Sequence, residues 1–254
     1  MELQKNKVKS ADRVLDIFEL YEGETESYSL SEISKILSMP PSSTYNLLQN
    51  MLERGYLETD RTGKQYQLGY KLFSIRNKRM KSGNLSESFL HVADKIFNDL
   101  NETVHLAVRM ENMLLYVGEK SSTHLLRFNS NTGQTAHLHA TASGKVLLAE
   151  LTEEELRKIY PHDALEKVTE KTISTYPDLL KELAKVRKEK FGYNMGETVE
   201  GVHCVSRAIY NAERRVVAAI SISIPVVRIT GEVWGKVHDC IKRASEEISI
   251  KAYG

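Results

Sequence analysis

The 254-residue sequence predicts an α+β protein with an N-terminal winged helix-turn-helix and a C-terminal domain built on an antiparallel sheet. Three observations predict this class. Within the first 70 residues, three helical patterns are followed by a strand–turn–strand pattern. Beyond residue 100, strand and helix patterns alternate. The hydrophobic content of 41% is sufficient to build packed cores in both parts.

The first two helices are predicted by apolar residues at helical spacing. Residues 14–21 place their apolar side chains on one side of a helical wheel, and Gly23 ends the pattern. Ser29 followed three residues later by Glu32 forms a capping box, which marks the start of a second helix. That helix is expected to end near Ser38.

A third helix and a hairpin complete the N-terminal pattern. Proline lacks an N–H, so Met39-Pro40-Pro41 ends the second helix, whereas Pro41 suits the first turn of a new one. This helix is predicted over 41–54, with Gly55 as its C-terminal cap. Residues 56–68 predict two strands around the turn Asp60-Arg61-Thr62-Gly63. Elements in this order are typical of the winged helix-turn-helix.

The remaining chain predicts a helical linker and an α+β domain. A helix is expected over 70–81, and another after residue 84. The expected domains are 1–70 for the winged helix-turn-helix, 71–100 for the linker and 101–254 for the C-terminal domain. In that domain the patterns predict strands at 104–110, 113–119, 202–210 and 216–224 and helices at 144–150, 178–191 and 231–250.

Charge is distributed asymmetrically although the formal net charge is only +1. Seven basic residues and no acidic one lie in 61–81, and Lys5, Lys7 and Lys9 mark the N-terminal tail. Such a distribution is typical of nucleic-acid binding, and a solvated helix face is the alternative interpretation. The seven are Arg61, Lys64, Lys71, Arg76, Lys78, Arg79 and Lys81.

Short polar side chains on the third helix predict contact with DNA. A recognition helix lays its N-terminal half in the major groove, where Asn and Gln can pair with adenine. The hydroxyls near the helix start can instead bind phosphate, or they can merely cap the helix. The basic wing tip can contact the minor groove or phosphates. The candidates for DNA contact are Ser42, Ser43, Thr44, Tyr45, Asn46, Gln49, Arg61 and Lys64.

Several classes of protein are disfavoured by composition. No apolar run is long enough for a membrane span, and the first ten residues do not resemble a signal peptide, so we expect a cytoplasmic protein without membrane contact. The two cysteines, Cys204 and Cys240, have no CxxC spacing and are expected to be reduced thiols. We expect no cofactor and no bound metal.

Three stretches together resemble the IclR (isocitrate lyase regulator) family of bacterial transcriptional regulators. The segment LSEISKILSMPPSSTYNLLQNMLERGYLE resembles the winged-helix part of that family. HLHATASGKVLLAEL at 137–151 is similar to its histidine-containing small-residue loop. GYNMGETVEGVHCVSRAIYNAERRVVAAISISIP at 192–225 is similar to its effector-domain motif, so the resemblance covers nearly the whole chain.

The resemblance implies a GAF-like effector-binding domain and a sequence-specific regulator, expected to be a repressor. It also implies a homodimer or tetramer on a palindromic double-stranded operator, controlled by a small carboxylic or sugar acid. A carboxylate suits the backbone N–H groups where Ser143-Gly144 opens a helix, and Ser221 and Ser223 share one strand face. The implied effector residues are Ala142, Ser143, Gly144, Val202, Cys204, Ser221 and Ser223.

The sequence departs from the family pattern at three places. The segment 194–200 is shorter and less acidic than usual, which leaves Glu197 as the candidate for an acidic pocket residue. Residues 211–214 replace a glycine-containing turn. Asn46 stands where an arginine is often found in the recognition helix, a change that can alter the operator.

Other functions remain open at this point. One is a small-molecule sensor that does not bind DNA, and another is a hydrolytic enzyme with Ser143 or Cys204 as nucleophile near His139 or His203, although no GxSxG is present. The polar alternation near Ser221 can also simply bury one face of a sheet. A metal site is a further alternative, with ligands among His105, His137, His139, His203 and Cys204.

Overall fold

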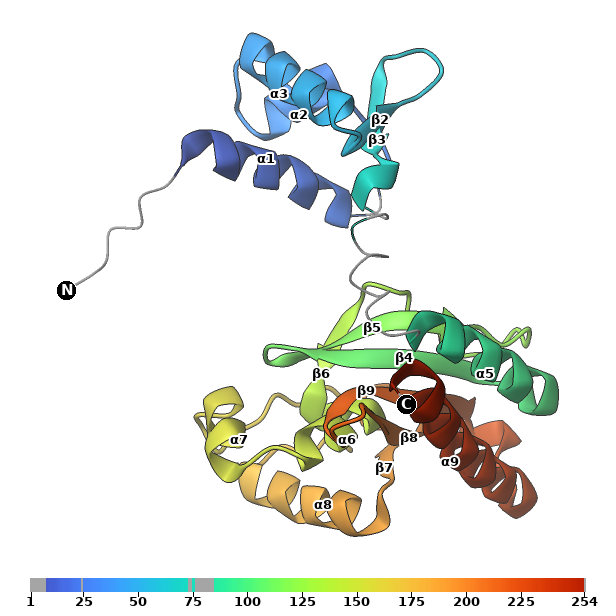
Figure 1. Cartoon of the computed structure of the whole chain (residues 1–254). Helices are drawn as coiled ribbons and strands as arrows, with labels where there is room; N and C mark the ends of the chain where they lie inside the picture. Colours follow the sequence, from blue (N-terminus) through green and yellow to red (C-terminus); the bar gives the residue numbers. More distant parts are fainter. Residues whose placement is uncertain (1–7, 24, 73–74, 76–84, 254) are drawn as a thin grey trace. The chain divides into compact units, whose positions relative to one another are not determined.

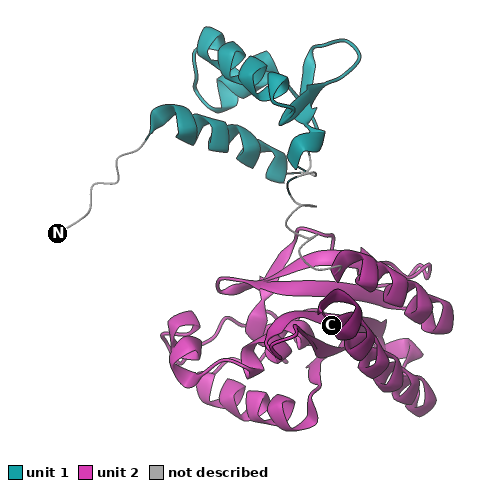
Figure 2. Cartoon of the chain, in the orientation of Figure 1, with its two compact units in different colours: residues 1–82 teal, residues 83–254 magenta. Residues whose placement is uncertain are grey.

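The chain forms two compact units, residues 1–82 and 83–254 (Figure 2). The computed structural model describes residues 8–23, 25–72, 75 and 85–253. Among these residues, no helix combines the length and apolar character needed to cross a membrane.

The first unit contains helices followed by a small antiparallel sheet, with strand order β1-β3-β2. Its core is formed by buried side chains that include Ile17, Ile33, Leu48 and Tyr66. The order of elements confirms the predicted winged helix-turn-helix. The bounds are α1 Lys9–Glu19, η1 Leu20–Glu22, β1 Tyr28–Ser29, α2 Leu30–Ile36, α3 Pro41–Glu53, β2 Leu57–Thr59 and β3 Gln65–Leu68.

The local signals in this unit act as predicted. The Ser29 side chain accepts a hydrogen bond from the Glu32 N–H and the Glu32 carboxylate accepts one from the Ser29 N–H, so both halves of the capping box form. Pro41 is the first residue of α3. Gly55 follows α3 with φ +74°, a left-handed conformation that glycine adopts without steric cost.

The second unit is built on a six-stranded antiparallel sheet with strand order β6-β5-β4-β9-β8-β7. The strands are β4 Thr103–Met110, β5 Met113–Lys120, β6 Thr135–His137, β7 Gly192–Met195, β8 Val202–Tyr210 and β9 Val216–Pro225. The helices are α5 Leu85–Leu100, η2 Leu138–Ala140, α6 Ala142–Ala149, α7 Glu153–Ile159, α8 Tyr176–Glu189, η3 Val226–Arg228 and α9 Gly231–Tyr253.

Helices cover both faces of this sheet (Figure 1). On one face α5 and α9 pack over β4, β8 and β9, with Phe89, Ile222 and Ile241 in a fully buried core. On the other face α6 packs on the same strands and α8 packs on α6, with Leu148 and Leu183 in a second core. The α+β class with an antiparallel sheet is therefore confirmed.

The linker expected at 71–100 differs from the observed structure in its second half. α5 places Phe89, Val92 and Ile96 in the core of the second unit, so this helix is part of that unit. Most of the helix expected over 70–81 lies outside the described residues. Strands β6 and β7 and helix α7 were not predicted, because three to seven residues carry too little periodicity.

Candidate functional site

The exposed side of α3 carries most of the predicted DNA-contacting residues. Ser42, Tyr45 and Asn46 are exposed, and Ser43 and Gln49 are half-buried. The opposite side is buried through Leu48 and Met51, which belong to the core of the first unit. The helix therefore presents a polar surface of the kind that a recognition helix lays in the major groove, with the ring of Tyr45 beside it.

Thr44 is a correction to the predicted set. Its side chain is fully buried, and its hydroxyl donates to the Pro40 carbonyl oxygen at 3.1 Å. The residue fixes the first turn of α3 against the core and has no surface to offer DNA. Its neighbours Ser43 and Tyr45 flank it on the accessible sides of the helix.

The wing is a tight turn organised by Asp60. One carboxylate oxygen accepts hydrogen bonds from the backbone N–H groups of Lys64 and Gln65, at 3.0 and 3.1 Å. The Thr62 hydroxyl also donates to this carboxylate, and these bonds lower the pKa of Asp60. Arg61 and Lys64 are thereby held at an exposed tip.

The second unit buries a polar face on the side of the sheet that α6 covers. Cys204 of β8 lies opposite Ser223 of β9, and their Sγ and Oγ atoms are 3.1 Å apart. Ser221 shares the face of Ser223, as strand alternation predicts. All three residues are less than a tenth exposed. Hydroxyls and a thiol thus line the centre of the sheet, where apolar side chains are usual.

The N-terminus of α6 meets this polar face. The Ser143 hydroxyl lies 3.1 Å from that of Ser206, the β8 residue opposite Ser221. Ala142 is buried beside Ser143, and Val202 lies at the start of β8, two residues before Cys204. The structure therefore brings the predicted effector residues to one region, with Val202 at its edge.

Gly144 has a different role from the expected one. Its N–H donates to the Thr141 side chain at 3.0 Å, so this group is not free to receive a carboxylate. A Cβ at this position would overlap the Leu138 carbonyl oxygen and lie 2.5 Å from the Leu138 Cα. Glycine is required here because the η2 turn approaches the helix closely.

The candidate nucleophiles of a hydrolase, Ser143 and Cys204, are not paired with His139 or His203 in this structure. His139 Nε2 lies 2.8 Å from the Glu166 carbonyl oxygen, whereas the Ser143 hydroxyl contacts Ser206. His203 lies against Trp234 of α9, on the opposite side of β8 from Cys204. Burial raises the pKa of Cys204 to about 11, which keeps it a thiol and not a nucleophilic thiolate.

The candidate metal ligands are also separated. His105 lies beside Tyr116, His203 beside Trp234, and His137 and His139 beside each other with 5.6 Å between ring centroids. Within the described part of the chain, no group of three His, Cys, Asp or Glu residues has the geometry of a metal site. Cys204 and Cys240 are buried and free.

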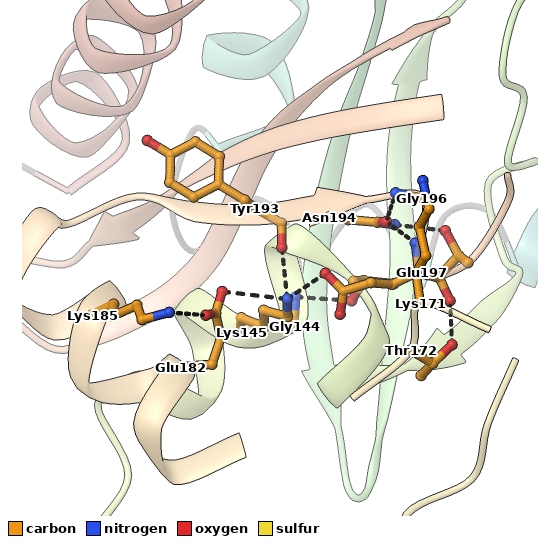
Figure 3. A network of polar contacts seen from close by, with 12 residues as sticks. Gly144, Lys145, Lys171, Thr172, Glu182, Lys185, Tyr193, Asn194, Gly196 and Glu197 are labelled. Carbon is orange, nitrogen blue, oxygen red and sulfur yellow. Dashed lines mark hydrogen bonds and ion pairs between the residues drawn. The ribbon is translucent and has the colours of Figure 1, made fainter. Parts of the chain in front are cut away.

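A buried lysine, Lys145 of α6, lies at the centre of a second polar network, which joins α6 to α8 and to the segment 193–197 (Figure 3). Its Nζ donates to Glu197 Oε1 at 2.6 Å, to the Tyr193 carbonyl oxygen at 2.8 Å and to Glu182 Oε1 at 3.4 Å. Burial raises the pKa of Glu197 despite the opposing effect of Lys145. Glu197, the candidate acidic pocket residue, is therefore engaged by a cation of the protein itself.

Three residues of the polar face were not predicted as effector residues, although His105 was considered as a possible metal ligand. Ser206 extends β8 beyond Cys204, and Thr103 and His105 of β4 lie opposite Ser223 and Ser221. The sequence feature that could have identified two of them is the polar alternation in Thr103-Val104-His105, because polar side chains are unusual in a strand that is buried on both faces. Only the register between distant strands shows that these side chains join the same face.

Comparison with known proteins identifies both units. Residues 10–61 match the IclR helix-turn-helix domain, and residues 77–250 match the bacterial transcriptional regulator IclR C-terminal domain. The regulator KdgR of Dickeya chrysanthemi is 29% identical over 261 residues, which cover 100% of this chain and 84% of the relative. The repressor AllR of Salmonella typhi is 30% identical, covering 95% of this chain and 89% of AllR.

A solved structure supports the same assignment. The crystal structure of the Thermotoga maritima IclR superimposes with a TM-score of 0.81 at 27% identity, covering 96% of this chain and 99% of the other. The two matched domains together account for most of the sequence. The chain belongs to the IclR family of bacterial transcriptional regulators, which combine a helix-turn-helix DNA-binding domain with a C-terminal effector-binding domain.

Proposed function

We propose that the protein is a cytoplasmic repressor whose affinity for a palindromic operator is lowered by a small carboxylic or sugar acid. The observation that carries the effector class is the row of buried hydroxyls beside the N-terminus of α6, where Ser143 meets Ser206. Hydroxyls and the N–H groups of a helix N-terminus suit an anionic ligand. A homodimer or tetramer places two recognition helices on successive major grooves of a palindrome.

On the DNA side, Asn46→Ala and Gln49→Ala should each weaken binding to the specific operator by about 1–3 kcal/mol, because each removes an amide able to pair with a base. Lys64→Ala should weaken binding to all DNA and reduce the slope of log affinity against log salt by about one. Fluorescence anisotropy with operator and scrambled duplexes separates the effects. Unchanged operator affinity in both amide variants would remove them from the interface.

On the effector side, an acid that binds the second unit should raise its melting temperature and release the operator. Ser223→Ala should raise the dissociation constant of that acid about tenfold, because one hydrogen bond to a charged group is lost. A thermal-shift screen of carboxylic and sugar acids on the full chain, followed by anisotropy, tests both steps. An acid that stabilises the protein but leaves operator affinity unchanged at every concentration contradicts the proposed regulation.

A further inference from the structure

His105 of β4 is a buried histidine with one ring nitrogen, Nδ1, that has no partner among the described residues. The residue is 1% exposed, its Nε2 faces only the Glu119 carboxylate at 3.5 Å, and its Nδ1 has no hydrogen-bond partner among the described residues. Buried polar atoms are nearly always hydrogen-bonded in folded proteins, so an imidazole in this state needs an explanation. A ligand that enters the polar face can supply the missing partner.

The surroundings of His105 favour one of its two ring nitrogens as the site of the proton. Its Nε2 lies 3.5 Å from Glu119 Oε2. Burial acts to raise the pKa of Glu119, but the His105 ring and the Ser121 hydroxyl outweigh it and the pKa is lowered, so Glu119 is a carboxylate. A carboxylate on the Nε2 side favours a proton on that atom, which leaves Nδ1 as the ring nitrogen that can bond to a ligand hydroxyl.

His105 also stands at a defined place on the polar face. It lies opposite Ser221 across β4 and β9, and Ser221 lies opposite Ser206 across β9 and β8. The Ser206 hydroxyl contacts Ser143 of α6. The main chain at His105 is therefore two strand spacings, roughly 10 Å, from the main chain at Ser206. A two- or three-carbon acid held at Ser143 is too short to reach it.

We propose that His105 recognises a hydroxyl at the far end of the effector, so that the effector is a hydroxylated acid of about five or six carbons, the length set by this strand spacing. The inference rests on the proposed function, because it assumes that the carboxylate binds at Ser143. Glu119 acts through His105 as a positioning residue. Its carboxylate also accepts a hydrogen bond from the Ser130 N–H at 3.2 Å, which connects His105 to the loop between β5 and β6.

The test uses pairs of acids that differ in a distal hydroxyl: pentanoate with 5-hydroxypentanoate, and hexanoate with 6-hydroxyhexanoate. Calorimetric titration of the full chain should give at least about tenfold tighter binding of each hydroxy acid, because the plain acid leaves the buried Nδ1 atom unpaired. In His105→Phe the ratio of the two affinities should fall to about one. His105→Asn should retain part of the preference for the hydroxy acid. The control His91→Phe changes an exposed histidine of α5 and should retain all of that preference.

The outcomes separate this inference from the proposed function. If the wild-type protein shows no hydroxyl preference, if the preference survives in His105→Phe, or if glyoxylate binds more tightly than the longer acids, the role of His105 is wrong while an acid effector stands. If the folded protein binds none of these acids, the effector class is overturned, and the inference with it.

Discussion

Replacing Lys145 by methionine should destabilise the second unit by about 3–5 kcal/mol at pH 8, because it leaves the buried Glu197 carboxylate without its cation. Lys145 is 1% exposed and Glu197 is 6% exposed, so water does not replace the lost contact. Urea denaturation of the full chain measures the effect through fluorescence of Trp234 in α9, which is the only tryptophan.

The loss of stability in Lys145→Met should become smaller as the pH falls. Burial already raises the pKa of Glu197 above 4.5, and loss of Lys145 raises it further. The folded variant then binds more protons than the unfolded chain between the two pKa values, so its stability falls as pH rises through that window. The penalty should therefore shrink as the pH falls through the raised pKa of Glu197 in the variant, by up to about 1.4 kcal/mol per pH unit.

Two further variants distinguish a buried ion pair from simple packing. Glu197→Gln should cost less than Lys145→Met, because Lys145 keeps the Tyr193 carbonyl oxygen and Glu182. Lys185→Met removes an exposed lysine from Glu182 and should change stability by less than about 0.5 kcal/mol. A loss in Lys145→Met that stays constant from pH 8 down to the lowest pH at which the protein is folded would contradict the electrostatic explanation.

The burial of Lys145 illustrates what the sequence could and could not predict. Long strands and capped helices were predictable because their signals are local, as for the capping box at Ser29 and the alternation along β9. Lys145 resembles a surface lysine in sequence. It is buried because α6 lies between the sheet and α8, so that every residue of this helix is enclosed.

In the candidate sites, too, local features could be predicted from the sequence, whereas features that depend on packing could not. The polar positions on α3 follow from helical periodicity, but the burial of Thr44 depends on how that helix packs in the core of the first unit. The effector residues were implied by family resemblance and not by spacing. His105 joins them only because β4 pairs with β9 in one register, and a shift by one residue would turn its side chain to the other face.

Gly144→Ala should destabilise the second unit by about 3 kcal/mol, because the new methyl group overlaps backbone atoms of Leu138 that cannot move without displacing the η2 turn. Gly235→Ala is the matched control. That glycine lies inside α9, and apart from the adjoining backbone of the helix no described atom lies within 4 Å of the position that an alanine methyl group would take, so alanine should stabilise the helix by up to about 1 kcal/mol.

The two variants also differ in their expected effect on function. The methyl group at position 144 pushes α6 away from the turn, which separates the Ser143 hydroxyl from Ser206 and should abolish the response of operator binding to the effector. DNA affinity without effector should persist, because α3 and the wing belong to the other unit. Anisotropy with and without the acid, at a temperature where both variants are folded, measures this difference. A Gly144→Ala protein that keeps wild-type stability and response would show that the η2 turn yields to α6, and that Gly144 is not what holds Ser143 against the polar face.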